Sequence, residues 1–324
     1  MAHGARSGAR IRRLIVVALL AAACRPAATG PTSTPSPVAT VSASPSASAP
    51  ATSSAPPTPA PVVLVGAGDI ASCALTGDAS TEAILATIPG TVFTLGDNAY
   101  ESGTADEFAR CYAPTWGREL ARTRPAIGNH DAATAKGAAY FAFFGAAAGE
   151  PGRGYYSYDA GAWHVVVLNS ECWMTACSAG SEQERWLRAD LAAHPGRCML
   201  AYWHHPYWSS GPHGNDATMR PFVDALYAAG ADLILNGHDH DYERFAPQDP
   251  DGNATARGVR EFVVGTGGAS PYGFAIVRPN SEKRIANVFG VLKLTLSSSG
   301  YAWSFIDTAG TTRDEGSSPC HAGA

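Results

Sequence analysis

Residues 62–69 read VVLVGAGD, residues 91–97 read TVFTLGD and residues 231–240 read ADLILNGHDH. Each is an apolar run that ends in a glycine followed by an acid or a histidine. Such runs are typical of buried strands whose two faces are both covered. CMLAYWHH at 198–205 has the same character, and RPAIGNHD at 124–131 is a further short segment that ends in a turn with polar side chains. The chain therefore predicts buried strands that carry polar side chains at their carboxyl ends.

Helical patterns alternate with these strands, namely STEAILATI at 80–88, SEQERWLRADLAAH at 181–194 and MRPFVDALYAAG at 219–230. Ser80 is the predicted N-cap of the first helix, and Ser181 with Glu184 forms a capping box for the second. Residues 154–171 are expected to hold two antiparallel strands, and further strands follow residue 260. The fold class is α/β, with two packed mixed β-sheets flanked by helices. Open α/β sheets bind ligands at their carboxyl strand ends.

The first 24 residues predict an export signal. Arginines up to Arg13 precede the apolar run LIVVALLAAA, which is too short to span a bilayer and ends at Cys24. The small residues before Cys24 resemble a lipoprotein processing site, and an ordinary signal peptide cut nearby is the alternative. We therefore expect an exported protein, extracellular or at the cell surface, whose only link to a membrane is a lipid on Cys24.

Residues 25–61 predict a disordered tether of Pro, Ser, Ala, Thr and Gly. Such a segment buries too little apolar surface to offset the entropy of ordering it. Residues 62–324 then form a single catalytic domain, since no second linker or repeat interrupts them. The formal net charge is −5, or −9 without the four arginines before Cys24. An acidic chain argues against a nucleic-acid-binding surface, although a metal site still admits a small phosphorylated substrate.

Six cysteines follow Cys24, and an even number in an exported chain indicates disulfides. They allow 15 connectivities, and none forms a CxxC zinc pattern. Two of them lie five residues apart and would clamp one loop. Two others follow the first two polar motifs, where a bridge would brace them. Among the alternatives, our expectation is the set Cys73–Cys111, Cys172–Cys177 and Cys198–Cys320.

Polar side chains gather at five strand ends: Asp69, Asp97 with Tyr100, Asn129 with His130, His204 with His205, and His238 with His240. Taken singly, each is most often a structural residue. Taken together, their buried carboxylates would repel at a cost on the order of several kcal/mol unless cations were bound. Carboxylate, imidazole and amide ligands suit Fe, Mn and Zn, and a shared carboxylate bridges a close metal pair. If the GHDH segment is extended, its two histidines face the same side.

The five motifs, in this order, resemble the calcineurin-like metallophosphoesterases and, within them, the purple acid phosphatases. The shared pattern is GD, GDxxY, GNH, xxH and GHxH, and it covers roughly residues 62–275. The resemblance implies a four-layer α/β/β/α sandwich with two metal ions. It also implies the ligands: Asp69, Asp97, Tyr100 and His240 for the first ion, and Asp97, Asn129, His204 and His238 for the second.

The resemblance assigns further roles by position. His130 would orient the phosphate or protonate the leaving group. His213, in the loop SSGPHGN that we expect to be flexible, matches a substrate-contacting histidine of the plant-type enzymes. Most members of the superfamily begin with Asp-x-His, but Ala71 stands at that third position. Tyr100 is placed to replace the missing ligand, with a packed aromatic as the alternative. A tyrosinate favours Fe(III), paired with divalent Fe, Zn or Mn.

Other polar residues have weaker claims. Asp131 is a candidate to orient the preceding histidine, and His205 either supports its neighbour or simply packs. We expect His164 to be structural and Asp239 to point away from its flanking histidines, toward the surface or the outer shell. GTGG at 265–268 predicts close backbone packing near the site.

The resulting hypothesis is an exported, purple acid phosphatase-like phosphomonoesterase in which a metal-bound hydroxide attacks phosphorus. A phosphodiesterase acting on nucleotides or lipid head groups is the runner-up, because the same metal core supports both reactions. The third reading is an inactive surface binding module that keeps the fold, since fold alone does not imply function.

Overall fold

The computed structural model describes residues 60–321, so the predicted export signal and nearly all of the tether lie outside the described residues. Strands in this part of the chain are β1 (Val62–Ala67), β2 (Ala71–Ser72), β3 (Thr91–Leu95), β4 (Ala99–Tyr100), β5 (Thr123–Ala126), β6 (Tyr156–Ala160), β7 (Trp163–Val167), β8 (Cys198–Tyr202), β9 (Leu233–Asn236), β10 (Tyr242–Phe245), β11 (Arg260–Val264), β12 (Ser281–Ile285), β13 (Gly290–Ser297), β14 (Gly300–Asp307) and β15 (Thr312–Pro319).

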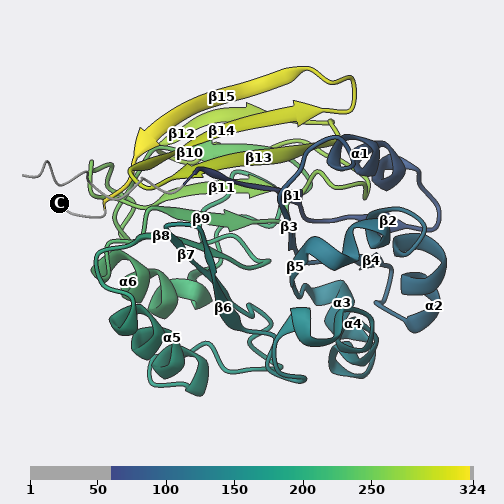
Figure 1. The fold of residues 1–324 in the computed structure, drawn as a ribbon, viewed down its shortest axis with the longest axis horizontal. Coiled ribbons are helices and arrows are strands. Elements are labelled where there is room, and N and C mark those ends of the chain that lie inside the picture. The colour runs from purple at the N-terminus through teal and green to yellow at the C-terminus, as the bar shows by residue number, and fades with distance from the viewer. Residues whose placement is uncertain (1–59, 322–324) are drawn as a thin grey trace, which may run out of the picture. The chain divides into compact units, whose positions relative to one another are not determined.

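The α-helices are α1 (Gly77–Leu85), α2 (Ala105–Glu107), α3 (Asn129–Ala133), α4 (Ala138–Phe144), α5 (Glu182–Ala193) and α6 (Arg220–Ala228). Helical segments of 3₁₀ or π type are η1 (Phe108–Tyr112), η2 (Trp116–Arg122), η3 (Ala135–Gly137), η4 (Gly145–Ala148) and η5 (Ala217–Met219). Figure 1 shows α5 and α6 together on one side of the strands and α1 to α4 on the other. Within residues 60–321, no helix has the length and apolarity that a membrane span requires.

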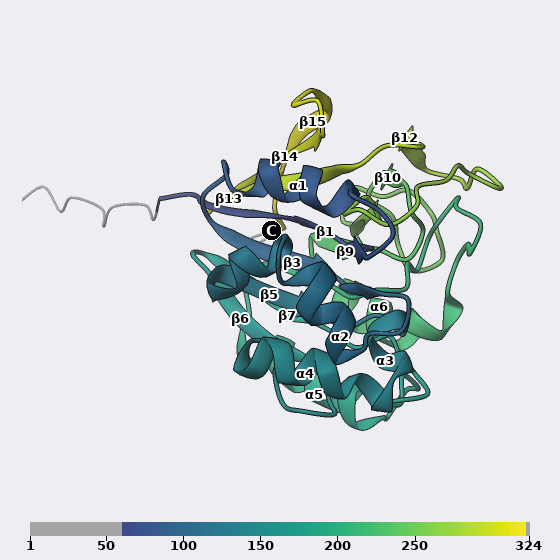
Figure 2. The same ribbon diagram turned by 90° about the vertical axis from the view of Figure 1, so that its right-hand side faces the viewer.

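Two large mixed sheets confirm the predicted α/β class. One has the strand order β15-β14-β13-β1-β3-β5, and the other has the order β12-β10-β11-β9-β8-β7-β6. β1, β3 and β5 are parallel neighbours, and Figure 2 shows them one beneath the other. β7, β8, β9 and β11 are likewise parallel neighbours in the second sheet. Each set of parallel strands therefore brings its carboxyl ends to one edge of its sheet.

The alternation of side chains along β8 explains how the sheets pack. Leu200 and Tyr202 join the core between the sheets, where the Tyr202 ring centroid lies 6.0 Å from that of Phe93 on β3. Met199 and Ala201 point to the opposite face, into the cluster formed with α5 and α6. Both faces of β8 are thus covered, which is why its sequence is apolar without interruption.

The three expected disulfides are all present. Cys73–Cys111, Cys172–Cys177 and Cys198–Cys320 have Cα–Cα distances of 5.1, 5.2 and 5.6 Å. The first ties the segment after β2 to η1, next to the second motif, and the last ties β8 to the end of β15. Such bridges are compatible with an oxidising, extracellular environment.

His164 on β7 is structural, in agreement with its position in an apolar strand. Its Nε2 lies 2.6 Å from Asp190 Oδ2, its Nδ1 lies 3.1 Å from Asp159 Oδ1, and its ring stacks on His194 at 3.7 Å. Burial by itself would lower the pKa of His164, but hydrogen bonds and charges from Asp190 and Asp159 outweigh burial and raise it.

This raised pKa predicts a pH-dependent contribution to stability. The contribution is complete below the unfolded-state pKa of about 6.5 and is lost as the pH rises through the higher folded-state value. We expect it to be about 1.5–3 kcal/mol, the size of a hydrogen bond to a charged group. Urea denaturation of the metal-free protein from pH 5.5 to 9 measures it. The stability difference between wild type and His164→Gln should shrink toward high pH; a difference that does not vary with pH contradicts the prediction.

Candidate metal centre

The predicted ligands come together at the carboxyl ends of both sheets. Asp69, Asp97 and Asn129 follow the parallel neighbours β1, β3 and β5, and His204 and His238 follow β8 and β9. Hydrogen bonds join the strand ends: His204 Nδ1 donates to Leu95 O at 2.8 Å, and the Gly237 amide donates to His204 O at 3.0 Å. The end of β3 in one sheet and the ends of β8 and β9 in the other sheet therefore meet at one polar edge.

One group of side chains surrounds the phenol of Tyr100. The Tyr100 Oη lies 2.8 Å from Asp69 Oδ1, 3.0 Å from Asp97 Oδ2 and 3.2 Å from His240 Nε2. Both carboxylates are fully buried or nearly so, and Tyr100 is 5% exposed. These are the four side chains that the resemblance assigns to the first ion.

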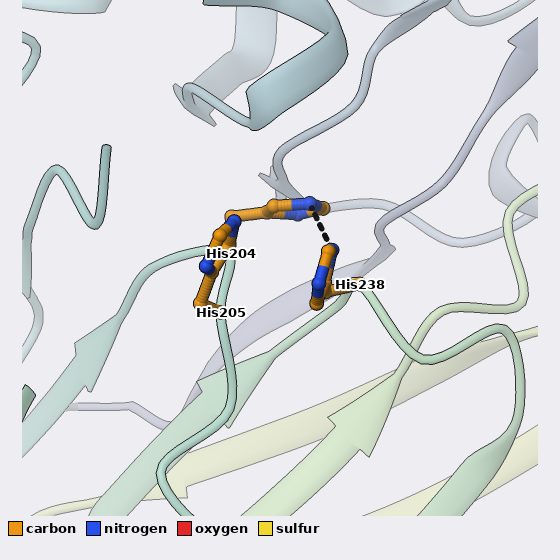
Figure 3. A group of neighbouring side chains, drawn as sticks. All are labelled: His204, His205 and His238. Carbon is orange, nitrogen blue, oxygen red and sulfur yellow. Dashed lines mark hydrogen bonds between the residues drawn. The ribbon is translucent and has the colours of Figure 1, made fainter. Parts of the chain in front are cut away.

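A second group surrounds the Nε2 atom of His204. This atom lies 3.0 Å from Asn129 Oδ1, 3.1 Å from His238 Nδ1 and 3.3 Å from Asp97 Oδ2. Figure 3 shows His204 and His238 pointing toward each other from neighbouring loops. Asp97 Oδ2 belongs to both groups, which is the position that a shared carboxylate requires.

The chemistry of these atoms fits cations. His204 Nδ1 faces Leu95 O, and His240 Nδ1 faces Ser270 O at 2.8 Å, so each of these nitrogens carries the proton. In the neutral form of each ring, Nε2 then carries the lone pair that is directed at the centre, the arrangement found for metal-ligating histidines. Carboxylate and amide oxygens join them with too few hydrogens to satisfy every acceptor. Bound cations would satisfy such a set.

The electrostatics lead to the same requirement. Burial would lower the pKa of His204, but the charge of Asp97 outweighs it and raises this pKa to about 10. Burial, Asp69 and Asp97 all raise the pKa of Tyr100 well above its ordinary value. Without an ion, a protonated His204 compensates the acids. A cation would take over that role and favour the deprotonated phenol.

Close packing explains the glycines that precede the ligands. A Cβ on Gly128 would lie 2.2 Å from Asp97 Oδ1, and a Cβ on Gly237 would lie 2.6 Å from Asp69 Oδ2. Three of the presumed ligands also have left-handed backbones, with φ of 61° at Asp69, 50° at Asp97 and 70° at His238. Such conformations cost about 1–3 kcal/mol each and cluster at functional sites. His238 is therefore not in an extended segment, so the condition under which the two GHDH histidines face the same side is not met.

His130 is the second residue of α3, which begins at Asn129. Its amide donates to Asp97 Oδ1 at 2.8 Å, and its ring Nδ1 donates to Glu101 O at 2.6 Å. The ring packs on Tyr100, and Nε2 lies 3.8 Å from Asp97 Oδ2. Nε2 is therefore next to the centre without belonging to either group of ligands.

The expectation that Asp131 orients His130 is wrong. The buried Asp131 carboxylate accepts from the Asn98 amide, at 2.9 Å, and from the Gly128 amide, at 3.0 Å. It thus ties the GDNAY and GNHD loops together, and a backbone carbonyl, Glu101 O, orients the His130 ring instead. The contact with Asn98 joins segments that are 33 residues apart, so residue spacing gives no sign of it.

Asp239 points away from its flanking histidines, as expected, but it lies inside the protein and not at the surface, which was one of its two expected positions. Ser209 and Ser210, at the start of the SSGPHGN loop that we expected to be flexible, are fully buried as well. Ser210 donates to Glu243 from both its amide and its hydroxyl. His213 is exposed, with its ring centroid 4.1 Å from that of His238. The structure thus places His213 beside the presumed ligands.

Sequence reasoning missed several residues that border the centre. Tyr272 stacks on His240 with ring centroids 4.8 Å apart and donates to His238 O. The buried Glu171 lies 3.3 Å from His205 Nε2, and the His205 ring stacks on that of His238 at 4.2 Å. These contacts favour the supporting role for His205 over simple packing.

The prediction of close backbone packing at GTGG, residues 265–268, is confirmed, since a Cβ on Gly265 would lie 2.1 Å from Asp239 O.

Residues 60–242, more than half of the chain, match the family model of the calcineurin-like phosphoesterases. The chain belongs to the calcineurin-like phosphoesterase family. Among curated relatives of this phosphoesterase, Purple acid phosphatase 15 of Arabidopsis thaliana is 36% identical over 96 residues, covering 28% of this chain and 18% of the relative. Purple acid phosphatase 18 of the same plant is 30% identical over 120 residues, covering 35% and 26%. The matches thus span about a quarter or less of the relatives' length.

Solved structures support the phosphoesterase fold. A purple acid phosphatase from yellow lupin (Lupinus luteus) seeds superposes with a TM-score of 0.65 at 20% identity, covering 80% of this chain and 53% of the other. GAP50, the anchor in the inner membrane complex of Plasmodium, superposes with a TM-score of 0.64 at 14% identity, covering 81% and 89%. At these identities the likeness concerns the fold. The similarity to purple acid phosphatases implies a binuclear metal centre for this phosphoesterase.

Proposed function

We propose that this phosphoesterase hydrolyses small phosphate monoesters with two metal ions bound at the described centre. The observation that supports the proposal is the grouping of seven ligand side chains around Tyr100 Oη and His204 Nε2, with Asp97 Oδ2 in both groups. Two bound cations would polarise the phosphoryl oxygens, activate water and offset charge on the leaving oxygen.

In this proposal the two groups are two ligand sets. One consists of Asp69, Asp97, Tyr100 and His240, and the other consists of Asp97, Asn129, His204 and His238. A phenolate in the first set favours Fe(III), and the second set would take divalent Fe, Zn or Mn. Iron-loaded protein whose visible absorption survives Tyr100→Phe would contradict this assignment.

The residues outside the ligand sets act on the phosphate. The Nε2 of His130 faces the centre and would orient a phosphate oxygen or deliver a proton to the departing alkoxide. His213 would contact the phosphate from the opposite side of His238. The carbonyl of Glu101 fixes the His130 ring, so that its placement costs no reorganisation during the reaction.

The proposed location of the protein is outside the cell or at the cell surface. The export signal and the lipid on Cys24 remain predictions from the sequence, since they lie outside the described residues. The disulfides within the catalytic part support an exported protein. We propose an extracellular or cell-surface enzyme that acts on small phosphorylated substrates and has no nucleic-acid-binding surface.

Steady-state kinetics on matched esters test the proposed reaction. We expect turnover of 4-nitrophenyl phosphate with a kcat/KM at least about tenfold above that of bis(4-nitrophenyl) phosphate, because the second aryl group competes with His130 and His213 for space and charge contacts; tenfold is 1.4 kcal/mol of transition-state discrimination. The reverse preference would favour the phosphodiesterase. Full metal loading without turnover of either ester would favour an inactive binding module.

A further inference from the structure

Asp239 stands between two presumed metal ligands in the chain, yet its carboxylate serves another part of the molecule. It is fully buried, and its short hydrogen bonds are with the loop of residues 209–213, which we call the His213 loop; the Tyr272 hydroxyl lies farther away, 3.5 Å from Asp239 Oδ1. Ser209 Oγ donates to Asp239 Oδ2 at 2.5 Å, and the His213 amide donates to Asp239 Oδ1 at 3.0 Å. One carboxylate therefore holds both ends of the loop.

The middle of the His213 loop packs directly on the same carboxylate. A Cβ on Gly211 would lie 2.2 Å from Asp239 Cγ, so only glycine fits at that position. The Gly211 amide donates to Ser209 Oγ at 3.0 Å, which leaves that hydroxyl free to donate to Asp239. The loop is thus folded around the acid.

The side chain of His213 has little else to fix it. It is exposed, and within residues 60–321 its ring nitrogens make no hydrogen bond that would orient it. Its ring lies on that of His238 at 4.1 Å, with Tyr272 at 6.2 Å. Its position relative to the centre is therefore determined by its backbone, and the backbone amide is bound to Asp239.

We propose that Asp239 is a positioning residue that couples the ligand segment 238–240 to the His213 loop and thereby places His213 for contact with the substrate phosphate. The inference rests on the proposed phosphoesterase function. Asparagine at this position removes the negative charge. Its NH2 group would also replace one of the two acceptor oxygens, and an NH2 group cannot accept a hydrogen bond from the Ser209 hydroxyl or the His213 amide. The loop then loses one of its two hydrogen bonds to residue 239 and keeps those of Ser210 to Glu243, while the His238 amide keeps its hydrogen bond to Asp69.

A double-mutant cycle between Asp239→Asn and His213→Ala tests this coupling. We expect each single variant to keep its full metal content and to lose about tenfold in kcat/KM on 4-nitrophenyl phosphate, equivalent to about one hydrogen bond in the transition state. The double variant should be no worse than His213→Ala alone, because the two changes remove the same interaction.

Asp241→Asn is the matched control. Asp241 is also fully buried, two residues further along, but its carboxylate oxygens accept no hydrogen bond from the described residues. Its effect should therefore add to that of His213→Ala. Additive effects in the Asp239 cycle, full activity of His213→Ala, or loss of metal from Asp239→Asn would each overturn the proposal.

A readout independent of turnover is amide hydrogen exchange in the metal-free protein. The His213 amide should exchange at least about tenfold faster in Asp239→Asn than in wild type or Asp241→Asn, since its acceptor is disturbed. Unchanged exchange overturns the inference even if activity falls. If wild type hydrolyses no phosphate ester, the proposed function fails, and the exchange result alone decides whether Asp239 holds the loop. Should Asp239→Asn fail to fold, Ser209→Ala, which removes the donor to Asp239 Oδ2, takes its place in the cycle with His213→Ala.

Discussion

Replacing Asp97 with asparagine should abolish activity and remove both metal ions together. Asp97 Oδ2 lies 3.0 Å from Tyr100 Oη and 3.3 Å from His204 Nε2, so one oxygen serves both ligand sets. Its loss removes a negative charge that two cations would share. We expect kcat/KM to fall by roughly 10³-fold or more, in line with several kcal/mol of metal-derived stabilisation of the transition state.

Metal analysis of the purified variant checks this expectation alongside the kinetics. Asp78→Asn is a suitable control, because Asp78, in the first turn of α1, is also buried but accepts its side-chain hydrogen bond from Thr115 and from none of the seven ligands. This control should retain both metals. An Asp97→Asn protein with two tightly bound ions would show that Asp97 does not bridge.

Replacing His130 with alanine should instead lower activity while leaving the metals bound. Its ring is held by Glu101 O and packs on Tyr100, and its Nε2 faces the centre outside both ligand sets. The amide that bonds to Asp97 belongs to the backbone and survives the substitution. We expect a loss of about 10²–10⁴-fold in kcat, the usual range for a general acid.

The identity of the leaving group distinguishes the two roles of His130. If His130 donates the proton, the loss should be largest for an alkyl phosphate and small for 4-nitrophenyl phosphate, whose leaving group needs no proton. An equal loss on both esters indicates that His130 orients the phosphate. Loss of metal from His130→Ala would contradict an outer position for this residue.

The ligand sets were accessible from the sequence because each motif is local. In each motif the apolar run indicates a buried strand, and the acid or histidine after the glycine indicates the candidate ligand, as at Gly96 and Asp97. The order of the motifs then places the ligands on neighbouring strands. The physical requirement for the glycine was not visible, since Gly128 meets Asp97 only through the folding of two loops.

Features that depend on contacts between distant segments were not predictable in the same way. The helical region from α2 to η4 carries no strong apolar period, and tertiary packing around residues such as Phe108 and Phe144 holds it together. Helix α1 begins at Gly77, with Thr76 rather than Ser80 at its N-cap, since its first turn packs against Gly268. The sequence did not show that Asp131 and Asp239 hold loops, because the fold brings those loops to the two acids and buries them.

The central claim is that two ions occupy the two groups of ligands, and anomalous diffraction from crystals of the metal-loaded protein tests it most directly. Data collected above and below the iron edge locate each ion and identify iron. We expect two peaks roughly 3.5–4 Å apart, one beside Tyr100 and Asp69 and the other beside His204 and Asn129, with Asp97 between them. A single peak, or peaks away from Asp97, would contradict the account.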